Sequence, residues 1–181
     1  PGDLLALVDH DRYLPDGYRP SDLTVSSVPF ISGDHDDRNL LRKEAADAVS
    51  ALFAAAEADG MPLAGVSGFR SSETQANLFA EYAALDGEEA ADRYSARAGH
   101  SEHQTGLAVD VVGIDGECPT EACFASRPEA AWLANYAHEF GFIVRYPKGR
   151  EATTGYAWES WHLRYVGTAI SAKFGPDSTF T

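Results

Sequence analysis

Apolar side chains recur at helical spacing in the first half of the chain. Across residues 38–59 they fall three or four positions apart, and Gly60 follows as a stop signal, so we expect a helix there. Two more helices are predicted where a Ser is followed three residues later by Gln or Glu, the pattern of a capping box. These boxes are residues 72–75 and 126–129, and the helix after the second is expected to end at Gly141.

Four shorter apolar runs are typical of strands. They cover residues 63–69, 107–112, 142–146 and 161–166, and a short helix is expected over residues 168–174. In the second run the side chains alternate, so Leu107, Val109 and Val111 share one face and Asp110 lies on the other. Helices come first and strands concentrate later. This order predicts an α+β fold, with a small, mainly antiparallel sheet flanked by helices.

The chain shows no internal repeat and no interdomain linker, and 181 residues suit one domain. Residues 1–37 are rich in Pro, Asp and Gly and are expected to form an extended segment that wraps around the catalytic domain of residues 38–181. We expect a monomer. The net charge of −14 argues against binding to nucleic acid or to anionic lipid. No apolar run reaches the roughly 18 residues that a membrane-spanning helix needs.

Three residues suggest a metal site. His103, Asp110 and His162 offer two imidazoles and a carboxylate, and a catalytic zinc needs three such ligands with one position open to water. Asp110 lies in an otherwise aliphatic strand, where an unpaired carboxylate is costly, so a cation is expected beside it. The alternatives are a salt bridge from an Arg to Asp110 and ordinary hydrogen-bonded histidines.

Glu159 is a candidate general base, because metal hydrolases use a carboxylate beside the metal to move a proton from water to the leaving group. It stands three residues before His162. In a regular strand, residues three apart point to opposite faces. If both residues face the metal, the chain must bulge between them, or Glu159 must lie in the turn before the strand.

Two motifs resemble a known family. Ser101-x-His103-x-x-Gly106-x-Ala108-x-Asp110 and Glu159-x-Trp161-His162-x-Arg164 are similar to the signature of the VanY-type D-alanyl-D-alanine carboxypeptidases and of the related L,D-carboxypeptidases. Residues 67–71 with Gln75 resemble a third motif of that family. The resemblance implies a zinc enzyme with the fold of the D-Ala-D-Ala dipeptidases and, more distantly, of hedgehog signalling domains.

The resemblance also implies roles for individual residues. His103, Asp110 and His162 would bind Zn²⁺, and Glu159 would be the general base. Arg70 would stabilise the oxyanion or hold the substrate, and Gln75 and Ser101 would line the substrate pocket. Gln75 has an alternative role as the last residue of the capping box at 72–75, and Arg70 has one as a surface cation. Which of Arg70, Arg97, Arg145 and Arg164 binds the substrate's terminal carboxylate stays open.

The implied reaction is removal of a C-terminal D-alanine from a peptidoglycan stem peptide ending in D-Ala-D-Ala. The alternatives are an L,D-carboxypeptidase that acts on tetrapeptide stems and a non-catalytic cell-wall-binding module. Cys118 and Cys123 stand close enough in the sequence to close a small disulfide loop, although two free thiols are the alternative. A disulfide and a cell-wall substrate both predict an extracellular or cell-envelope location, outside the cytoplasmic membrane.

Overall fold

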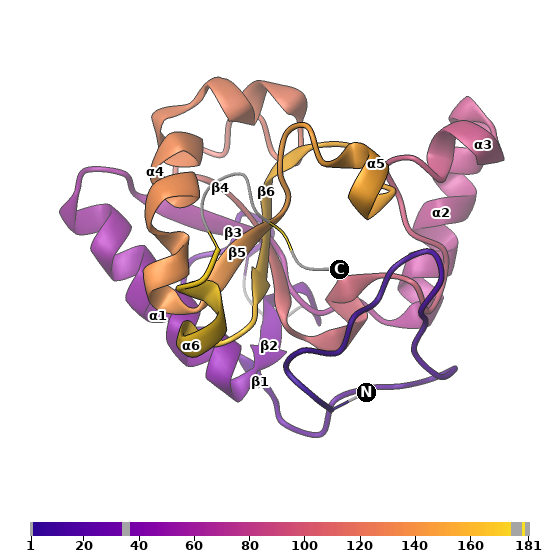
Figure 1. Ribbon diagram of the computed structural model, residues 1–181, viewed down its shortest axis with the longest axis horizontal. Coiled ribbons are helices and arrows are strands. Elements are labelled where there is room, and N and C mark those ends of the chain that lie inside the picture. The colour runs from indigo at the N-terminus through magenta and orange to yellow at the C-terminus, as the bar shows by residue number, and fades with distance from the viewer. Residues whose placement is uncertain (1, 34–36, 175–178, 180–181) are drawn as a thin grey trace.

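A computed structural model describes residues 2–33, 37–174 and 179 (Figure 1). Its strands are β1 (Leu23–Val25), β2 (Leu40–Arg42), β3 (Leu63–Ser67), β4 (Ala108–Gly113), β5 (Phe142–Tyr146) and β6 (Glu159–Tyr165). Its α-helices are α1 (Lys43–Ala58), α2 (Ser72–Asp86), α3 (Glu88–Ala91), α4 (Pro128–Tyr136), α5 (Glu151–Thr154) and α6 (Thr168–Ser171). Its 3₁₀ helices are η1 (Asp37–Asn39), η2 (Glu102–Thr105), η3 (Ala122–Ser126) and η4 (Ala137–Phe140). The predicted α+β class is confirmed.

The main sheet has four strands in the order β3-β4-β6-β5, and every neighbouring pair is antiparallel. β1 and β2 form a separate antiparallel pair. Each strand of the main sheet lies where an apolar run predicted one, and β5 has the predicted bounds. The sheet is therefore small and antiparallel, as expected.

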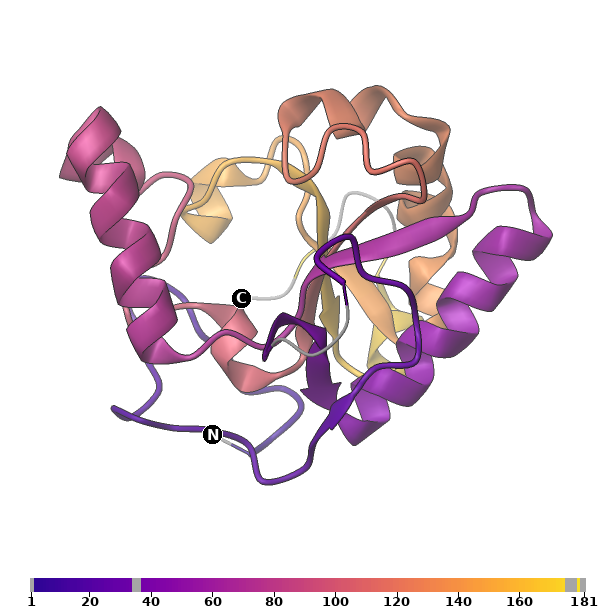
Figure 2. The ribbon, with the colours of Figure 1, turned by 180° about the vertical axis from the view of Figure 1, so that it is seen from behind.

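One side of the sheet carries the hydrophobic core. Helices α1 and α4 cover that side, and α2 and α3 lie across the sheet from them (Figures 1 and 2). The buried apolar residues of α1 and β4 belong to one hydrophobic cluster. Residues of this core with no exposed surface include Leu52, Leu107, Val109, Leu133 and Leu163. Among the described residues, no helix combines the length and the apolar character that a membrane crossing requires.

The helix starts differ from the sequence prediction. The first helix begins at Lys43 rather than near residue 38, because Leu40–Arg42 pairs with β1 as strand β2. The N-cap of α2 is Ser71, whose Oγ accepts a hydrogen bond from the Thr74 amide at 3.1 Å. The capping box predicted at residues 72–75 is thus wrong by one position. The box at 126–129 is also wrong: α4 starts after Arg127 without a side-chain cap, with Pro128 in its first turn.

The N-terminal segment contacts several distant parts of the chain. Its Leu14 amide donates to the Gly99 carbonyl at 2.9 Å, and Arg164 Nη2 donates to the carbonyls of Leu4 and Ala6 at 2.9 Å each. The short strand β1 within it was not predicted. Because β1 pairs with β2, this strand pair links the predicted N-terminal segment to the predicted catalytic domain. The division of the chain between residues 37 and 38 stays a prediction. The two predicted ranges, 1–37 and 38–181, include some positions outside the described residues. These positions are 1, 34–36, 175–178 and 180–181.

Candidate active site on the polar face of the sheet

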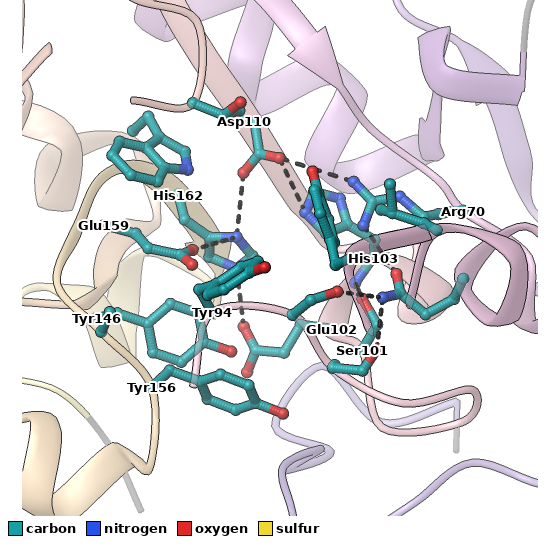
Figure 3. Close-up of a pocket in the computed structure, with 18 of the residues that line it drawn as sticks. Arg70, Tyr94, Ser101, Glu102, His103, Asp110, Tyr146, Tyr156, Glu159 and His162 are labelled. Atoms are coloured by element: carbon teal, nitrogen blue, oxygen red, sulfur yellow. Dashed lines mark hydrogen bonds and ion pairs between the residues drawn. The ribbon is translucent and has the colours of Figure 1, made fainter. Parts of the chain in front are cut away.

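Three separate elements bring the predicted metal ligands together. His103 comes from η2, Asp110 from β4 and His162 from β6 (Figure 3). Asp110 and His162 are direct partners in the antiparallel register, so their side chains lie on the same face of the sheet. One ligand atom from each of the three residues lies within 4.8 Å of the others, and all three side chains are buried.

Two glycines let η2 approach the sheet. Gly106 ends η2 with a φ of +68°, a left-handed conformation that favours glycine, and β4 starts two residues later. Gly68 follows β3 and passes very close to the backbone of residues 38–40; a side chain there would stand 2.6 Å from the Leu40 carbonyl oxygen. The carbonyl of Gly68 thereby reaches His103.

Each histidine is oriented by one ring nitrogen and faces Asp110 with the other. His103 Nδ1 donates to the Gly68 carbonyl at 2.7 Å, and its Nε2 lies 3.2 Å from Asp110 Oδ2. His162 uses the opposite arrangement: its Nε2 lies 3.4 Å from Glu102 Oε2, and its Nδ1 lies 3.1 Å from Asp110 Oδ1. The two inward-facing nitrogens and the carboxylate form one cluster.

Burial and the neighbouring side chains together shift the pKa values of the three residues in this cluster. Burial alone would raise the pKa of Asp110, but the neighbouring His103 and His162 hold that pKa well below its usual range. Burial lowers the pKa of His103. Burial would also lower the pKa of His162, but its hydrogen bonds with Asp110 and Glu102 raise it to about 9. Asp110 is thus an anion, and His162 holds a proton more tightly than an ordinary histidine.

Glu159 faces the same cluster, and the sheet is irregular at that point. Val144 of β5 pairs with Leu163, but Tyr146 pairs with Glu159, so β6 contains extra residues between these two pairs. This register shift is an irregularity of the kind that the spacing predicts if Glu159 and His162 face the same site. Glu159 Oε2 lies 3.7 Å from His162 Nδ1. Burial raises the pKa of Glu159 to about 8.

Arg70 lies beside the cluster and is held by its neighbours. Its Nη1 donates to Gln75 Oε1 at 2.8 Å, its Nη2 donates to Ser67 Oγ at 3.1 Å, and Nη2 lies 3.9 Å from Asp110 Oδ2. Its side chain is 17% exposed, so Arg70 is not a surface cation.

Gln75 is buried and serves no capping box. Its Nε2 donates to the Ala96 carbonyl at 2.6 Å and to Ser95 Oγ at 3.3 Å, while its Oε1 accepts from Arg70. Ser101 is buried where η2 begins, and its Oγ accepts a hydrogen bond from the His103 amide at 3.3 Å. The structure thus connects Gln75 to Arg70, and Ser101 to His103.

These residues line a cavity of about 280 Å³. Its aromatic wall consists of Tyr82, Tyr94, Tyr146, Tyr156, Trp158 and Trp161. Sequence reasoning did not identify Tyr82 or Tyr94 as cavity residues. Tyr82 lies within α2 and Tyr94 follows α3, and neither residue belongs to one of the motifs. Cys118 and Cys123 form a disulfide, and Thr120 of the loop between them also lines the cavity.

The four arginines that could bind the substrate's terminal carboxylate have different surroundings in the structure. Arg70 lines the cavity, whereas Arg97 pairs with Asp92 and Glu88 outside it. Arg145 and Arg164 are buried, and both form ion pairs with Glu102. Of these four, Arg70 is therefore the one placed to meet a substrate in this cavity.

Glu102 was missed by the sequence reasoning. Burial alone would raise its pKa, but Arg164 and Arg145 hold that pKa well below its usual range. The only signal was its place between Ser101 and His103 in the motif. Its partners come from β5 and β6, more than forty residues further along the chain, so no local pattern predicts them.

Comparison with known proteins identifies the family to which the chain belongs. The sequence model of the VanY family, described as D-alanyl-D-alanine carboxypeptidase, matches residues 38–168. Bacillus subtilis (strain 168) YodJ, which is named as a carboxypeptidase, is 41% identical over all 181 residues, and the match spans 66% of YodJ. The chain spans smaller shares of the other curated relatives, between 30% and 55%.

Two solved structures illustrate the similarity in fold. The LdcB LD-carboxypeptidase is 39% identical with a TM-score of 0.90, covering 98% of this chain and 85% of the other. A mutant of the vancomycin resistance D,D-pentapeptidase VanY from the VanB-type resistance cassette, solved in complex with Zn(II), is 31% identical with a TM-score of 0.75, covering 96% and 93%. From the family match and this fold, the chain belongs to the VanY family, whose model is described as D-alanyl-D-alanine carboxypeptidase.

Proposed function

We propose that this protein is a zinc-dependent carboxypeptidase that removes a C-terminal D-alanine from peptidoglycan stem peptides. The observation that carries the proposal is the convergence of His103, Asp110 and His162 beside Glu159 and Arg70 in one cavity. The similarity to the zinc-bound VanY structure supports the choice of metal.

The donor atoms fit a zinc ion. Two imidazoles and one carboxylate form a ligand set used by catalytic zinc sites, and one ligand atom from each residue lies within 4.8 Å of the others. Asp110 Oδ2 lies 3.2 Å from His103 Nε2, and Asp110 Oδ1 lies 3.1 Å from His162 Nδ1. Each histidine uses its other nitrogen in a hydrogen bond, as metal-binding histidines usually do. Bound zinc would supply Lewis acidity toward the scissile carbonyl and would lower the pKa of a water molecule.

The surrounding residues supply the rest of the chemistry. Glu159 would accept a proton from the attacking water and deliver it to the leaving amine of D-alanine. Burial raises the pKa of Glu159 to about 8 in the metal-free site, and a bound cation would lower that pKa toward the range in which the carboxylate can accept a proton near neutrality. Arg70 would donate hydrogen bonds to the developing oxyanion or to the substrate's carboxylate. Gln75 would keep Arg70 aimed into the cavity, and the Ser101 hydroxyl would donate to the bound peptide.

Two substrates are compatible with this site. A D,D-carboxypeptidase would cleave a pentapeptide ending in D-Ala-D-Ala, which the family description supports. An L,D-carboxypeptidase would remove the single D-alanine from a tetrapeptide. We favour the tetrapeptide reaction, because the similarity in fold and in sequence is greater to the LdcB LD-carboxypeptidase than to the VanY D,D-pentapeptidase.

The test measures alanine release from both peptides by the zinc-loaded protein. Release from the tetrapeptide alone supports the L,D reaction, and release from the pentapeptide alone supports the D,D reaction with the same residues in the same roles. Release from neither peptide, despite bound zinc, would contradict the proposed activity and would favour the non-catalytic cell-wall-binding module.

We further propose that the protein acts as a monomer outside the cytoplasmic membrane. The disulfide supports the location, because stable disulfides form mainly in oxidising compartments. Thiol titration of the unreduced, denatured protein should detect no free cysteine. Two titratable thiols would count against the location. Light scattering should give the mass of one chain.

A further inference from the structure

Glu102 bridges His162 and two arginines. Its side chain is fully buried, and its two oxygens have different partners. Oε2 lies 3.4 Å from His162 Nε2. Oε1 lies 2.8 Å from Arg145 Nε and 2.9 Å from Arg164 Nη1. One carboxylate thus joins η2, β5 and β6 behind the proposed metal ligand. Figure 3 shows the contact between Glu102 and His162 as a dashed line.

We infer that Glu102 is a positioning residue, which holds the His162 ring so that Nδ1, and not Nε2, binds the metal. The inference rests on the proposed function. An ionised carboxylate can only accept a hydrogen bond, so Nε2 of His162 must carry the proton. His103 is held in the opposite sense, with its proton on Nδ1, by the Gly68 carbonyl.

The two arginines explain how a buried carboxylate can do this. A buried anion without partners is costly, and two guanidinium groups offset that cost. Arg164 is itself anchored to the carbonyls of Leu4 and Ala6, and the Arg145 guanidinium lies 5.1 Å from the centre of the Tyr146 ring. Glu102 therefore has a fixed place from which to orient His162. Carboxylates that orient a metal-binding histidine raise metal affinity by about 10- to 100-fold in comparable sites.

The first test uses the wild-type protein and needs no variant. Long-range ¹H–¹⁵N spectra of the zinc-loaded protein report which nitrogen of each histidine carries the proton. The expected result is a proton on Nε2 of His162 and on Nδ1 of His103. A zinc complex in which His162 carries its proton on Nδ1 would overturn the inference.

The second test measures zinc affinity by competition with a chelator. Glu102→Gln removes the charge and keeps the shape, and it is expected to weaken zinc binding about 10- to 100-fold. Glu102→Asp keeps a charge for the arginines but withdraws the oxygen from His162, and the same loss is expected. The second variant also decides the question if Glu102→Gln does not fold.

Glu129→Gln is the matched control. Glu129 is also a buried carboxylate paired with an arginine, Arg127, but it lies on α4 and does not line the cavity. This variant should lower the unfolding temperature of the metal-free protein without changing zinc affinity. If Glu102→Gln and Glu102→Asp both fold and bind zinc as tightly as the wild type, the positioning role is refuted and the proposed function is not affected. A wild-type protein that binds no zinc would refute the proposed function as well.

Discussion

The two faces of the β4–β6 ladder differ sharply although they share one backbone. Val109 and Leu163 are paired on one face, and both are fully buried in the hydrophobic core. Asp110 and His162, one position along, are paired on the other face beside the cavity. The apolar pair needs only close packing, whereas every polar group on the other face needs a partner. The same strands therefore provide stability on one side and chemistry on the other, and substitutions on the two faces should have separable effects.

The largest effect is expected from His162→Ala. Removing one of three ligands should abolish stoichiometric zinc binding and with it the release of alanine, because the remaining two ligands define no catalytic site. Metal analysis of the purified variant checks this. His138→Ala, which alters a histidine outside the cavity, is the control and should keep its zinc. Tight zinc binding by His162→Ala would show that the ligand set is wrong.

Glu159→Ala should separate binding from chemistry on the polar face. The variant is expected to keep the zinc and the fold but to lose at least about two orders of magnitude in turnover, the usual contribution of a positioned general base. Zinc content and kcat, measured on the same preparation, test the two halves of this statement. Loss of zinc would make Glu159 a ligand and would require a new role for Asp110.

Leu163→Ala tests the apolar face of the same strand. Deleting a fully buried leucine side chain should lower the free energy of unfolding by about 2–5 kcal/mol. Zinc affinity and turnover at low temperature should stay close to wild type, because the Asp110–His162 pair remains. Denaturant unfolding of the metal-free protein gives the stability. A loss of zinc affinity as large as that of a Glu102 variant would show that the two faces are not separable.

The smallest expected effect is a pH dependence of zinc binding. The pKa of His162 is raised to about 9 in the metal-free protein, so at pH 7 its Nδ1 carries a proton that zinc must displace. Raising the pH toward 9 removes this competition, so apparent affinity should rise about tenfold per pH unit between pH 7 and 8. Calorimetry in buffers of different ionisation enthalpy should detect proton release on zinc binding at pH 7. An affinity that does not change with pH over this interval would contradict the raised pKa.

The sequence predicted the parts of the molecule that depend on local pattern. The positions of the main-sheet strands follow from runs of apolar residues, and α1 follows from helical periodicity. The predicted ligands His103, Asp110 and His162 do lie together. The spacing of Glu159 and His162 predicted either a bulge between them or a place for Glu159 in the preceding turn, and the register of β5 and β6 shifts at this point. The exact caps were not predictable in this way, since Ser71 and Ser72 both have a hydroxyl and only the fold selects Ser71.

Only the tertiary structure decided which partners the buried polar groups have. Gln75 could have completed a capping box, but the fold directs its amide to Arg70 and Ala96. Arg145 and Arg164 were candidates to bind substrate, but the fold directs both to Glu102. The physical reason is that a hydrogen bond or ion pair depends on a distance of about 3 Å between atoms, whichever residues supply them. Sequence determines which charges and donors exist and how local segments fold; the packing of distant strands determines which of them meet.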